Sequence, residues 1–573
     1  MKTIKHLHPA TLFGLLIASA AVAQQAAGPA ARDGEPVIRL DAFTVKSEND
    51  RGYMASQSIS GSRFVTDLKD FPFSLQVLTA DFMKDIGAVN LPEALTYATG
   101  VIAAQSNQTA EVSVVQRGYV TALQLRDGVR KPGGFDAAGA ERIEVINGPS
   151  SVLFGITNPG GTINYLSKKP VQRPLAEFAQ TFGSWGTTRT VLDLGGPLGN
   201  SGVLAFRMPS SYSRSDGYYV NSASRKAYTS PVISWQVAPA TTLEVGIELQ
   251  KSDYIPVTNL LAVLDQSRLA FFQPRDFNGN TPRMYMDLRT TMPTFSLTHG
   301  FGRNWQLRSN SSFYSNVNET FYAKRGAVRA ALNFAYPRQA EFDLISDRSF
   351  QHNTDLVGTF RAFNGTLTAI AGVEYRDAFN RTNQRTSNAP GGVAPPSWLL
   401  LDRSTWNYNE DSFSGMVQLA DSTTDFHSLA YSLLAQYKSR NERLTAAGGI
   451  RHDSTTAIFN DFLARSLGQS FKVDKITMQI GGLYWLRPNE LSIYGNYSTS
   501  FQPLTSPLID INFRAFNPVP VTGAGVEIGL RQQLFGGRFV HSLGVYRIEQ
   551  ENLPSVLLRT STSTTVSFYD TQG

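Results

Sequence analysis

The sequence of 573 residues contains no cysteine, which excludes both disulfide bonds and metal sites built from thiolates. It also lacks long apolar runs. Outside the N-terminus no stretch reaches the ~18 apolar residues of a transmembrane helix, and the mean hydropathy is −0.19. A helical membrane protein is therefore excluded. A membrane-spanning β-barrel is not, because its strands alternate apolar and polar residues and so average to a low hydropathy.

Strong charge and catalytic motifs are missing as well. The formal net charge is +6 and no dense Lys/Arg run with interleaved aromatics occurs, so nucleic-acid binding is not expected. The seven histidines are scattered without metal-ligand spacing, and neither a G-x-S-x-G nor a P-loop pattern is present. We therefore expect no catalytic residues, no bound metal and no cofactor, and an enzyme is not predicted.

The N-terminus has the pattern of a secretory signal peptide. Two lysines precede an apolar stretch over residues 12–20, and the small residues Ala21 and Ala23 fit the A-x-A cleavage pattern. A short buried helix is the alternative. We predict a signal peptide over residues 1–23, which places the mature protein outside the inner membrane.

Residues 24–50 form a separate N-terminal segment. Its first part is rich in Ala, Gly and Pro and has no periodicity, which is typical of a flexible tail. A short β-prone island, Val37 to Val45, follows. An extended island of this kind can add as a strand to the sheet edge of a partner, because its main-chain donors and acceptors are free. The alternative is a first strand of the next domain.

Residues 51–171 are predicted to form a small α+β domain. Apolar residues at helical spacing predict short helices over residues 81–86 and 91–97, the second with Asn90 as N-cap. Alternating apolar residues near Arg117-Gly118 indicate strands on either side of it. Turn-forming pairs such as Gly148-Pro149 separate further short strands.

Six phrases occur within this domain in a fixed order. They are Pro72-Phe-Ser-Leu-Gln-Val-Leu-Thr79, Asp85-Ile-Gly87, Leu91-Pro-Glu-Ala-Leu-Thr-Tyr-Ala-Thr-Gly-Val101, Gln116-Arg-Gly-Tyr119, Leu125-Arg-Asp-Gly-Val129 and Ala140-Glu-Arg-Ile-Glu-Val-Ile-Asn-Gly-Pro-Ser-Ser-Val-Leu-Phe-Gly155. With Asn158 to Pro170 they resemble the plug domain of TonB-dependent outer-membrane receptors, in the siderophore-receptor branch. The family usually carries Arg before the Gly-Pro, where this chain has Asn147, and that change would remove a contact between plug and barrel wall.

This resemblance implies a partner and a location. The plug would sit inside an outer-membrane β-barrel of a Gram-negative bacterium, in contact with outer-membrane lipid. The TonB–ExbB–ExbD complex of the inner membrane would supply the energy that opens it. The family's TonB box falls on the island described above, at Asp41, Ala42, Phe43, Thr44 and Val45.

From residue 172 to residue 573 the pattern predicts barrel strands. Apolar Leu243, Val245, Ile247 and Leu249 alternate with polar residues, and residues 367–376 and 526–531 repeat the pattern. One apolar and one charged face fit a strand between lipid and a wet lumen. A soluble β-sandwich or propeller whose apolar face is its core is the alternative.

Loop lengths favour the barrel. Tight links such as Phe363-Asn-Gly365 and Arg487-Pro-Asn489 close hairpins, whereas longer polar and aromatic loops lie around residues 253–288, 378–425 and 500–518. Short turns at one rim and long loops at the other are typical of outer-membrane barrels. A propeller would show a repeat of ~40–50 residues, and none is present.

The number of strands is smaller than the family's. The alternation gives about 15 full strands, the last from about Phe539 to Gln550, and Val566 to Tyr569 looks like the start of another. The complete family barrel has about 22 strands. Because a barrel must close to satisfy its backbone in lipid, we expect this chain to be truncated at its C-terminus, with its first and last strands unpaired.

The resemblance also implies where a ligand would bind. In the siderophore-receptor branch two plug loops reach the outward side. On this chain they carry Gln105, Asn107 and Gln108, which can hydrogen-bond a chelate, together with Lys131, which can meet its negative charge, and Phe135, which can stack on it. Each of these can instead be a solvated turn residue.

The sequence therefore predicts TonB-dependent, energised import of a ferric siderophore by a monomer, with the iron carried inside the ligand. A receptor of the same family for cobalamin or an oligosaccharide is one alternative. A passive barrel whose plug does not move is another, and a soluble carbohydrate-active β-protein is a third.

Overall fold

The computed structural model describes residues 50, 52–105, 112–121, 124–258, 263–265, 268–270, 275–325, 335–387, 391–393, 396–399, 402–408, 415–505, 508–509, 515–516, 519–535, 538–560 and 565–572. The predicted signal peptide, the predicted TonB box, Asn107 and Gln108 lie outside these residues.

Residues 57–167 form the plug, the small α+β domain that the sequence predicts. Its strands make a five-stranded sheet in the order β3-β9-β10-β7-β8, a three-stranded sheet β4-β5-β6 and the pair β1-β2. The bounds are β1 Gln57–Ser58, β2 Thr66–Asp67, β3 Leu75–Thr79, α2 Ala80–Asp85, α3 Leu91–Leu95, β4 Val101–Gln105, β5 Val112–Gln116, β6 Tyr119–Thr121, β7 Gln124–Arg126, β8 Val129–Arg130, β9 Ala140–Asn147, α4 Ser151–Phe154 and β10 Gly161–Ser167. Two further single turns lie at Leu68–Asp70 and Ala137–Gly139.

Local sequence explains the start of the plug helices. Asn90 caps α3: its side chain accepts a hydrogen bond from the Glu93 backbone N–H at 3.0 Å, and the Glu93 carboxylate accepts the Asn90 N–H in return. This reciprocal pair satisfies two backbone donors that the first helical turn leaves free. The predicted cap is confirmed.

Strand β9 is the centre of the plug. It lies between β3 and β10, and Ile143 and Val145 are fully buried in the main apolar cluster, together with Leu91 and Leu95 of α3. Glu144 projects from the opposite face of β9 and is also fully buried. The strand is therefore covered on both sides.

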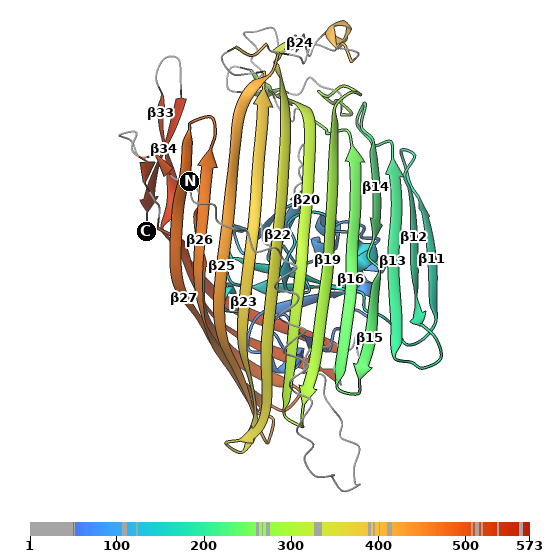
Figure 1. Cartoon of the computed structure of the whole chain (residues 1–573), viewed down its shortest axis with the longest axis vertical. Helices are drawn as coiled ribbons and strands as arrows, with labels where there is room; N and C mark the ends of the chain where they lie inside the picture. Colours follow the sequence, from blue (N-terminus) through green and yellow to red (C-terminus); the bar gives the residue numbers. More distant parts are fainter. Residues whose placement is uncertain are drawn as a thin grey trace, which may run out of the picture. The chain divides into compact units, whose positions relative to one another are not determined.

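Most of the remaining chain forms one 16-stranded antiparallel sheet, here called the wall. Its strands are β11 Leu175–Phe182, β12 Thr188–Pro197, β13 Leu204–Ser215, β14 Ser224–Thr229, β15 Val232–Ala238, β16 Thr241–Tyr254, β19 Tyr285–Phe301, β20 Trp305–Arg325, β22 Arg338–Ala362, β23 Gly365–Thr386, β25 Val417–Ser439, β26 Leu444–Asp461, β27 Ser466–Arg487, β28 Leu491–Gln502, β31 Val521–Leu534 and β32 Phe539–Glu551. Figure 1 shows the long central strands side by side.

The strand count agrees with the prediction. Strands β14 and β15 lie in line, because both pair with β13 and with β16. Pro231, which has no backbone N–H to donate, follows Ser230 in the break between them. Taken as one interrupted strand, they give the fifteen strands expected, ending at β32. In the described sheet order, β11 and β32 are the two edge strands.

Apolar side chains of the wall are exposed and the charged side chains between them are buried. This is the reverse of a soluble sandwich, whose apolar face is its core. Val526 and Ile528 are 48% and 67% exposed, whereas Glu527 between them is 4% exposed. Likewise Leu249 is 40% exposed and Glu248 is fully buried. The apolar face points away from the plug and the charged face points toward it, which is the arrangement of a lipid-facing wall.

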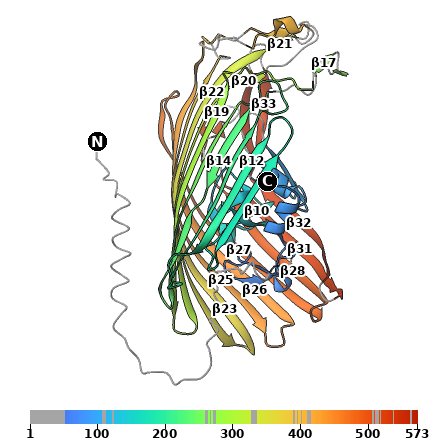
Figure 2. The ribbon, with the colours of Figure 1, turned by 90° about the vertical axis from the view of Figure 1, so that its right-hand side faces the viewer.

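The wall has one rim of short turns and one rim of longer connections, as predicted. Phe363 and Asn364 join β22 to β23 with φ of 51° and 57°, and similarly tight links follow β19 and β27. The longer connections carry the small pairs β17 Val263–Asp265 with β18 Arg268–Ala270, β21 Ala335–Tyr336 with β24 Trp398–Leu399, and β29 Leu508–Ile509 with β30 Ala515–Phe516. In Figure 2 the wall curves and the blue plug elements lie on its inner side.

The last hairpin differs from the expectation. Val566 to Tyr569 do lie in a strand, β34 Thr565–Gln572, but this strand pairs with β33 Leu553–Thr560 in a separate two-stranded sheet. Strand β33, which contains Pro554 at its second position, is not among the predicted strands.

Candidate functional site

The plug contacts the inner face of the wall, and its N-terminal part lies at the short-turn rim. The guanidinium of Arg531, three residues from the end of β31, donates to the carbonyls of Leu68 at 2.9 Å and Phe73 at 2.6 Å. Asp70 accepts a hydrogen bond from Trp485 Nε1 at 3.0 Å and forms an ion pair with a lysine of β25 at 2.7 Å. This segment is therefore fixed near the hairpin turns.

The segment after β8 extends toward the long-loop rim. Its backbone accepts hydrogen bonds from Tyr314, at the Pro132 carbonyl, and from Lys226, at the Phe135 carbonyl. Lys226 lies only two residues from the loop end of β14. Residues 130–136 are thus directed away from the short turns.

A buried ion cluster joins this segment to β16. Lys131 Nζ lies 2.8 Å from Glu248 Oε1, and Arg126 Nη1 lies 3.1 Å from Glu248 Oε2. Burial lowers the pKa of Lys131, and the Glu248 carboxylate offsets part of that effect. All three side chains are at least nine-tenths buried. One wall carboxylate is therefore paired with two plug cations away from water.

A second cluster lies beside it with the charges reversed. Asp136 of the plug is bound by Arg189 Nη2 at 2.6 Å and by Lys226 Nζ at 3.2 Å, and it accepts a hydrogen bond from Ser211. Burial alone would raise the pKa of Asp136, but the two cations outweigh it and lower the value to about 2. The carboxylate is therefore ionised at any physiological pH.

Further buried pairs hold other sides of the plug. Arg63 binds Asp355 of β22 at 2.8 Å, and Arg117 binds Glu527 of β31 at 2.6 Å. Because β16, β22 and β31 are distant in the sheet order, the plug is clamped on several sides.

The plug backbone lies very close to the wall at Gly139. A Cβ on Gly139 would meet the Tyr228 hydroxyl at 1.8 Å. Only a residue without a side chain fits there, between the turn Ala137–Gly139 and β14.

The predicted ligand-binding residues fall in three different settings. Gln105 is the last residue of β4, while Asn107 and Gln108 lie outside the described residues. Lys131 is bound to Glu248, and Phe135 is buried in the plug core, edge-on to Tyr165 at 5.3 Å. Ligand binding by Lys131 and Phe135 stays a prediction, and it would require both side chains to leave these contacts.

Asn147 makes its contacts within the plug. Its side chain accepts a hydrogen bond from Gln116 at 2.9 Å and donates one to Ser74 at 3.2 Å. Arg117, the neighbour of Gln116, forms an ion pair with Glu527 of the wall, and Ser151 accepts a hydrogen bond from the Phe501 backbone N–H of β28.

The long loops contain a small apolar core of their own. Trp398 is almost fully buried and contacts Phe277, Tyr336, Trp406 and a neighbouring tyrosine. Trp398 and Trp406 thus hold three loops together.

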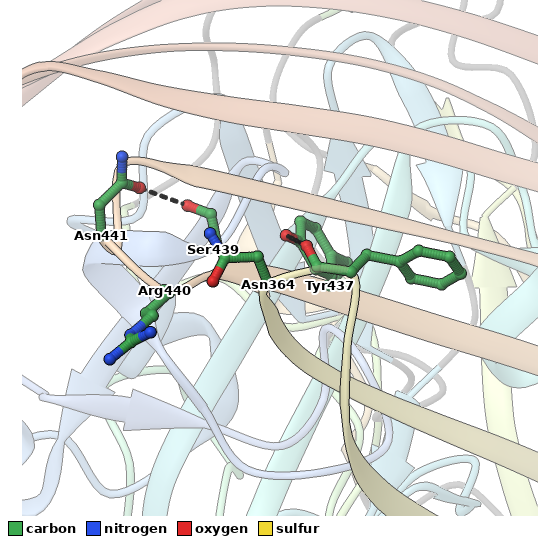
Figure 3. A pocket seen from close by; sticks show the side chains of 6 residues that line it. Asn364, Tyr437, Ser439, Arg440 and Asn441 are labelled. Carbon is green, nitrogen blue, oxygen red and sulfur yellow. Dashed lines mark hydrogen bonds between the residues drawn. The ribbon is translucent and has the colours of Figure 1, made fainter.

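A surface pocket of about 440 Å³ lies at the opposite rim. Figure 3 shows Asn364, Tyr437, Ser439, Arg440 and Asn441 around it, with Ser439 donating to Asn441 at 2.8 Å. Asn364 lies in the turn after β22, Tyr437 and Ser439 in the last residues of β25, and Arg440 and Asn441 in the turn that follows, so the pocket lies at the short-turn rim.

No helix in the described part of the chain is long and apolar enough to cross a membrane. Among the described residues no group of three or more His, Asp or Glu side chains converges to hold a metal ion.

A plug clamped by buried charges to the polar face of a wall with a lipid-facing exterior defines a plugged outer-membrane β-barrel. The sequence matches the TonB-dependent receptor-like β-barrel family over residues 234–573 and the TonB-dependent receptor plug domain over residues 67–162. The first match covers more than half of the chain. The chain belongs to the TonB-dependent receptor family, whose members are outer-membrane proteins of Gram-negative bacteria, as predicted.

Similar proteins are receptors for metal chelates. The chain is 26% identical to the metal-pseudopaline receptor of Pseudomonas aeruginosa, over 91% of this chain and 73% of that protein. It is 22% identical to the ferrichrome outer membrane transporter and phage receptor of Escherichia coli, over 96% and 77%. The crystal structure of the ferripyoverdine receptor of P. aeruginosa bound to ferripyoverdine has a TM-score of 0.78 at 20% identity, covering 89% of this chain and 67% of that one.

Proposed function

We propose that this receptor imports a ferric siderophore across the outer membrane, with energy supplied by the TonB–ExbB–ExbD complex. The observation that carries the proposal is the buried clamp between plug and wall. Breaking one partner away from a buried ion pair costs about 3–5 kcal/mol. The pairs at Glu248, Asp355 and Glu527 would together keep the plug closed until external energy is supplied to open it.

The ligand class rests on the relatives. The names of the similar receptors include ferrichrome, ferrioxamine B and pyoverdine. These names favour a chelate over cobalamin or an oligosaccharide. The likeness to a metal-pseudopaline receptor supports a second candidate, the same kind of chelate loaded with another metal.

Growth under iron restriction tests the proposal. A host that lacks its own siderophore receptors is given the receptor gene and grown on a panel of ferric siderophores, with and without a functional TonB. We expect at least one chelate to restore growth only when TonB is present. Growth on none of them, with uptake of cobalamin or an oligosaccharide instead, would contradict the proposed ligand class. Zinc-loaded chelates in a parallel uptake assay test the second candidate.

A further inference from the structure

The pocket at the short-turn rim lies on the lipid-facing side of the wall. It has a volume of about 440 Å³ and lies between the turn that follows β22 and the end of β25 (Figure 3). On β25 the exposed residues Tyr431 and Leu433 alternate with buried ones. Because side chains of a strand alternate between its two faces, Tyr437 and Ser439 project to the same outward face as Leu433. The pocket therefore continues the exposed apolar face of the wall at its short-turn edge.

The polar part of the pocket lining offers hydrogen-bond donors. The Asn441 side-chain oxygen accepts from Ser439 Oγ at 2.8 Å and from the Arg443 backbone N–H at 3.2 Å. The amide NH2 group of Asn441 is therefore the end that is left to donate. Arg440 is exposed in the same turn, and its backbone N–H donates to the Asn364 carbonyl at 3.0 Å. Its guanidinium group has no partner among the described contacts.

The charge of this lining favours an anion. It includes one cation, Arg440, and no Asp or Glu among the described residues. The carboxylate closest in sequence is Glu442, whose Oε2 lies 3.2 Å from Lys438 Nζ. Guanidinium and amide donors bind phosphate oxygens well, because several N–H groups can converge on one anion. The pocket therefore has the donors of a phosphate site.

Two aromatic side chains border these donors. Phe363, the first residue of the turn after β22, is 85% exposed, and Tyr437 donates its hydroxyl to the Phe363 carbonyl at 2.6 Å. Phe363 has a φ of 51°, a left-handed conformation that suits Gly, Asn or Asp in a tight hairpin. The turn thus presents a large apolar ring at a position where Asn fits better. A free phosphate ion gives no reason for this ring, whereas the carbons of a lipid would cover it.

We propose that this pocket binds the phosphate of an anionic glycerophospholipid in the periplasmic leaflet of the outer membrane. Arg440 and Asn441 donate to the phosphate oxygens, and Phe363 and Tyr437 pack on the glycerol and the first acyl carbons. The short turns of outer-membrane barrels lie on the periplasmic side, which places the pocket at the level of these headgroups. Since no described residue of the lining is a carboxylate that could receive an ammonium group, a headgroup with net negative charge is preferred. This site goes beyond the proposed import function and does not depend on it.

Lipid binding to the purified receptor in detergent, measured by native mass spectrometry on the full chain, tests the proposal. The probes are dioleoyl phosphatidylglycerol, dioleoyl phosphatidylethanolamine and glycerol 3-phosphate. We expect the wild type to bind phosphatidylglycerol about fivefold more tightly than phosphatidylethanolamine, and glycerol 3-phosphate most weakly. Arg440→Gln should weaken binding of phosphatidylglycerol about tenfold, the loss expected for a hydrogen bond between charged groups.

Phe363→Asn tests the aromatic contact. It should weaken binding of phosphatidylglycerol about threefold or more without lowering the melting temperature in lipid-free detergent, because Asn suits the left-handed turn. The matched control is Phe535→Asn, since Phe535 has a φ of 54° and is 79% exposed but is not part of the pocket lining. The control for Arg440→Gln is Arg303→Gln, in the exposed turn after β19. Neither control should change the lipid affinity.

Each outcome decides between a specific site and general contact with lipid. Weaker binding in Arg440→Gln and Phe363→Asn but in neither control supports the site. Equal loss in all four variants, or loss in none, shows general lipid contact and overturns it. Glycerol 3-phosphate bound as tightly as phosphatidylglycerol shows a site for free phosphate and overturns the lipid assignment, and equal binding of the two lipids overturns the preference for an anionic headgroup. The uptake assays test import separately, so failure of one proposal leaves the other standing.

Discussion

Replacing Glu248 with Gln tests how firmly the plug is clamped. The change removes the negative charge that is paired with Lys131 at 2.8 Å and Arg126 at 3.1 Å, and both cations stay buried. Leaving one member of a buried ion pair unpaired costs about 3–5 kcal/mol. Since 1.4 kcal/mol corresponds to a factor of ten, the closed state of the plug should become less favoured by roughly a hundredfold to a few thousandfold.

The assay is hydrogen exchange of the β9 amides in the purified receptor, with denaturant added below the unfolding of the wall. We expect faster exchange in Glu248→Gln, because the plug opens more often. The matched control is Glu244→Gln on the same strand. Its ion pair with Lys169, two residues after the plug, spans 3.0 Å, but the two side chains are 50% and 25% exposed, so the pair contributes about 1 kcal/mol or less.

A double variant tests whether the unpaired buried cations cause the faster exchange. Adding Lys131→Met to Glu248→Gln removes one of the stranded cations and should recover part of the lost protection. Exchange in Glu248→Gln that is no faster than in Glu244→Gln would refute the clamp. Faster exchange in the double variant than in Glu248→Gln alone would refute it as well.

Three further predictions concern the plug and the N-terminal segment. The pKa of Asp136 is lowered from an ordinary 3.8 to about 2, which stabilises the folded protein above pH 4. This stabilisation is lost as the pH falls toward 2. The difference in melting temperature between wild type and Asp136→Asn should therefore shrink over that range. Gly161→Ala should destabilise the plug by a few kcal/mol, because φ is +141° and a Cβ would lie 2.2 Å from the Ile146 carbonyl oxygen; Gly128→Ala, with open space around it, should cost only about 1–2 kcal/mol in denaturant unfolding. N-terminal sequencing of the outer-membrane protein should begin at Gln24, and a start at Met1 would contradict the predicted signal peptide.

Local sequence patterns predict most of the fold. The alternation of apolar and polar residues gives the fifteen wall strands, because a strand between lipid and a wet lumen repeats every two residues. The capping pair of Asn90 and Glu93 likewise needs only neighbours along the chain. What the alternation missed was β33, with its Pro554, and the break at Pro231 that divides one wall strand into β14 and β15.

The clamp was not predicted, because its partners are far apart in sequence. Lys131 and Glu248 are 117 positions apart. The local Lys-Pro-Gly-Gly pattern predicts a turn, but it does not indicate that the lysine is buried. The predicted ligand role of Lys131 came from its charge and its loop. Glu248 did stand on the polar side of an alternating strand, and that position was the available signal for a lumen-facing partner.

Accumulation of a radiolabelled ferric siderophore by whole cells tests the central claim most directly. The wild-type receptor and Phe43→Pro, in the predicted TonB box, are compared with and without an uncoupler of the proton-motive force. Proline removes a backbone donor and fixes φ, so an added strand cannot form at that position. We predict that both treatments abolish uptake while surface binding of the chelate persists. Uptake that continues after the uncoupler would contradict energised import and would favour a passive barrel.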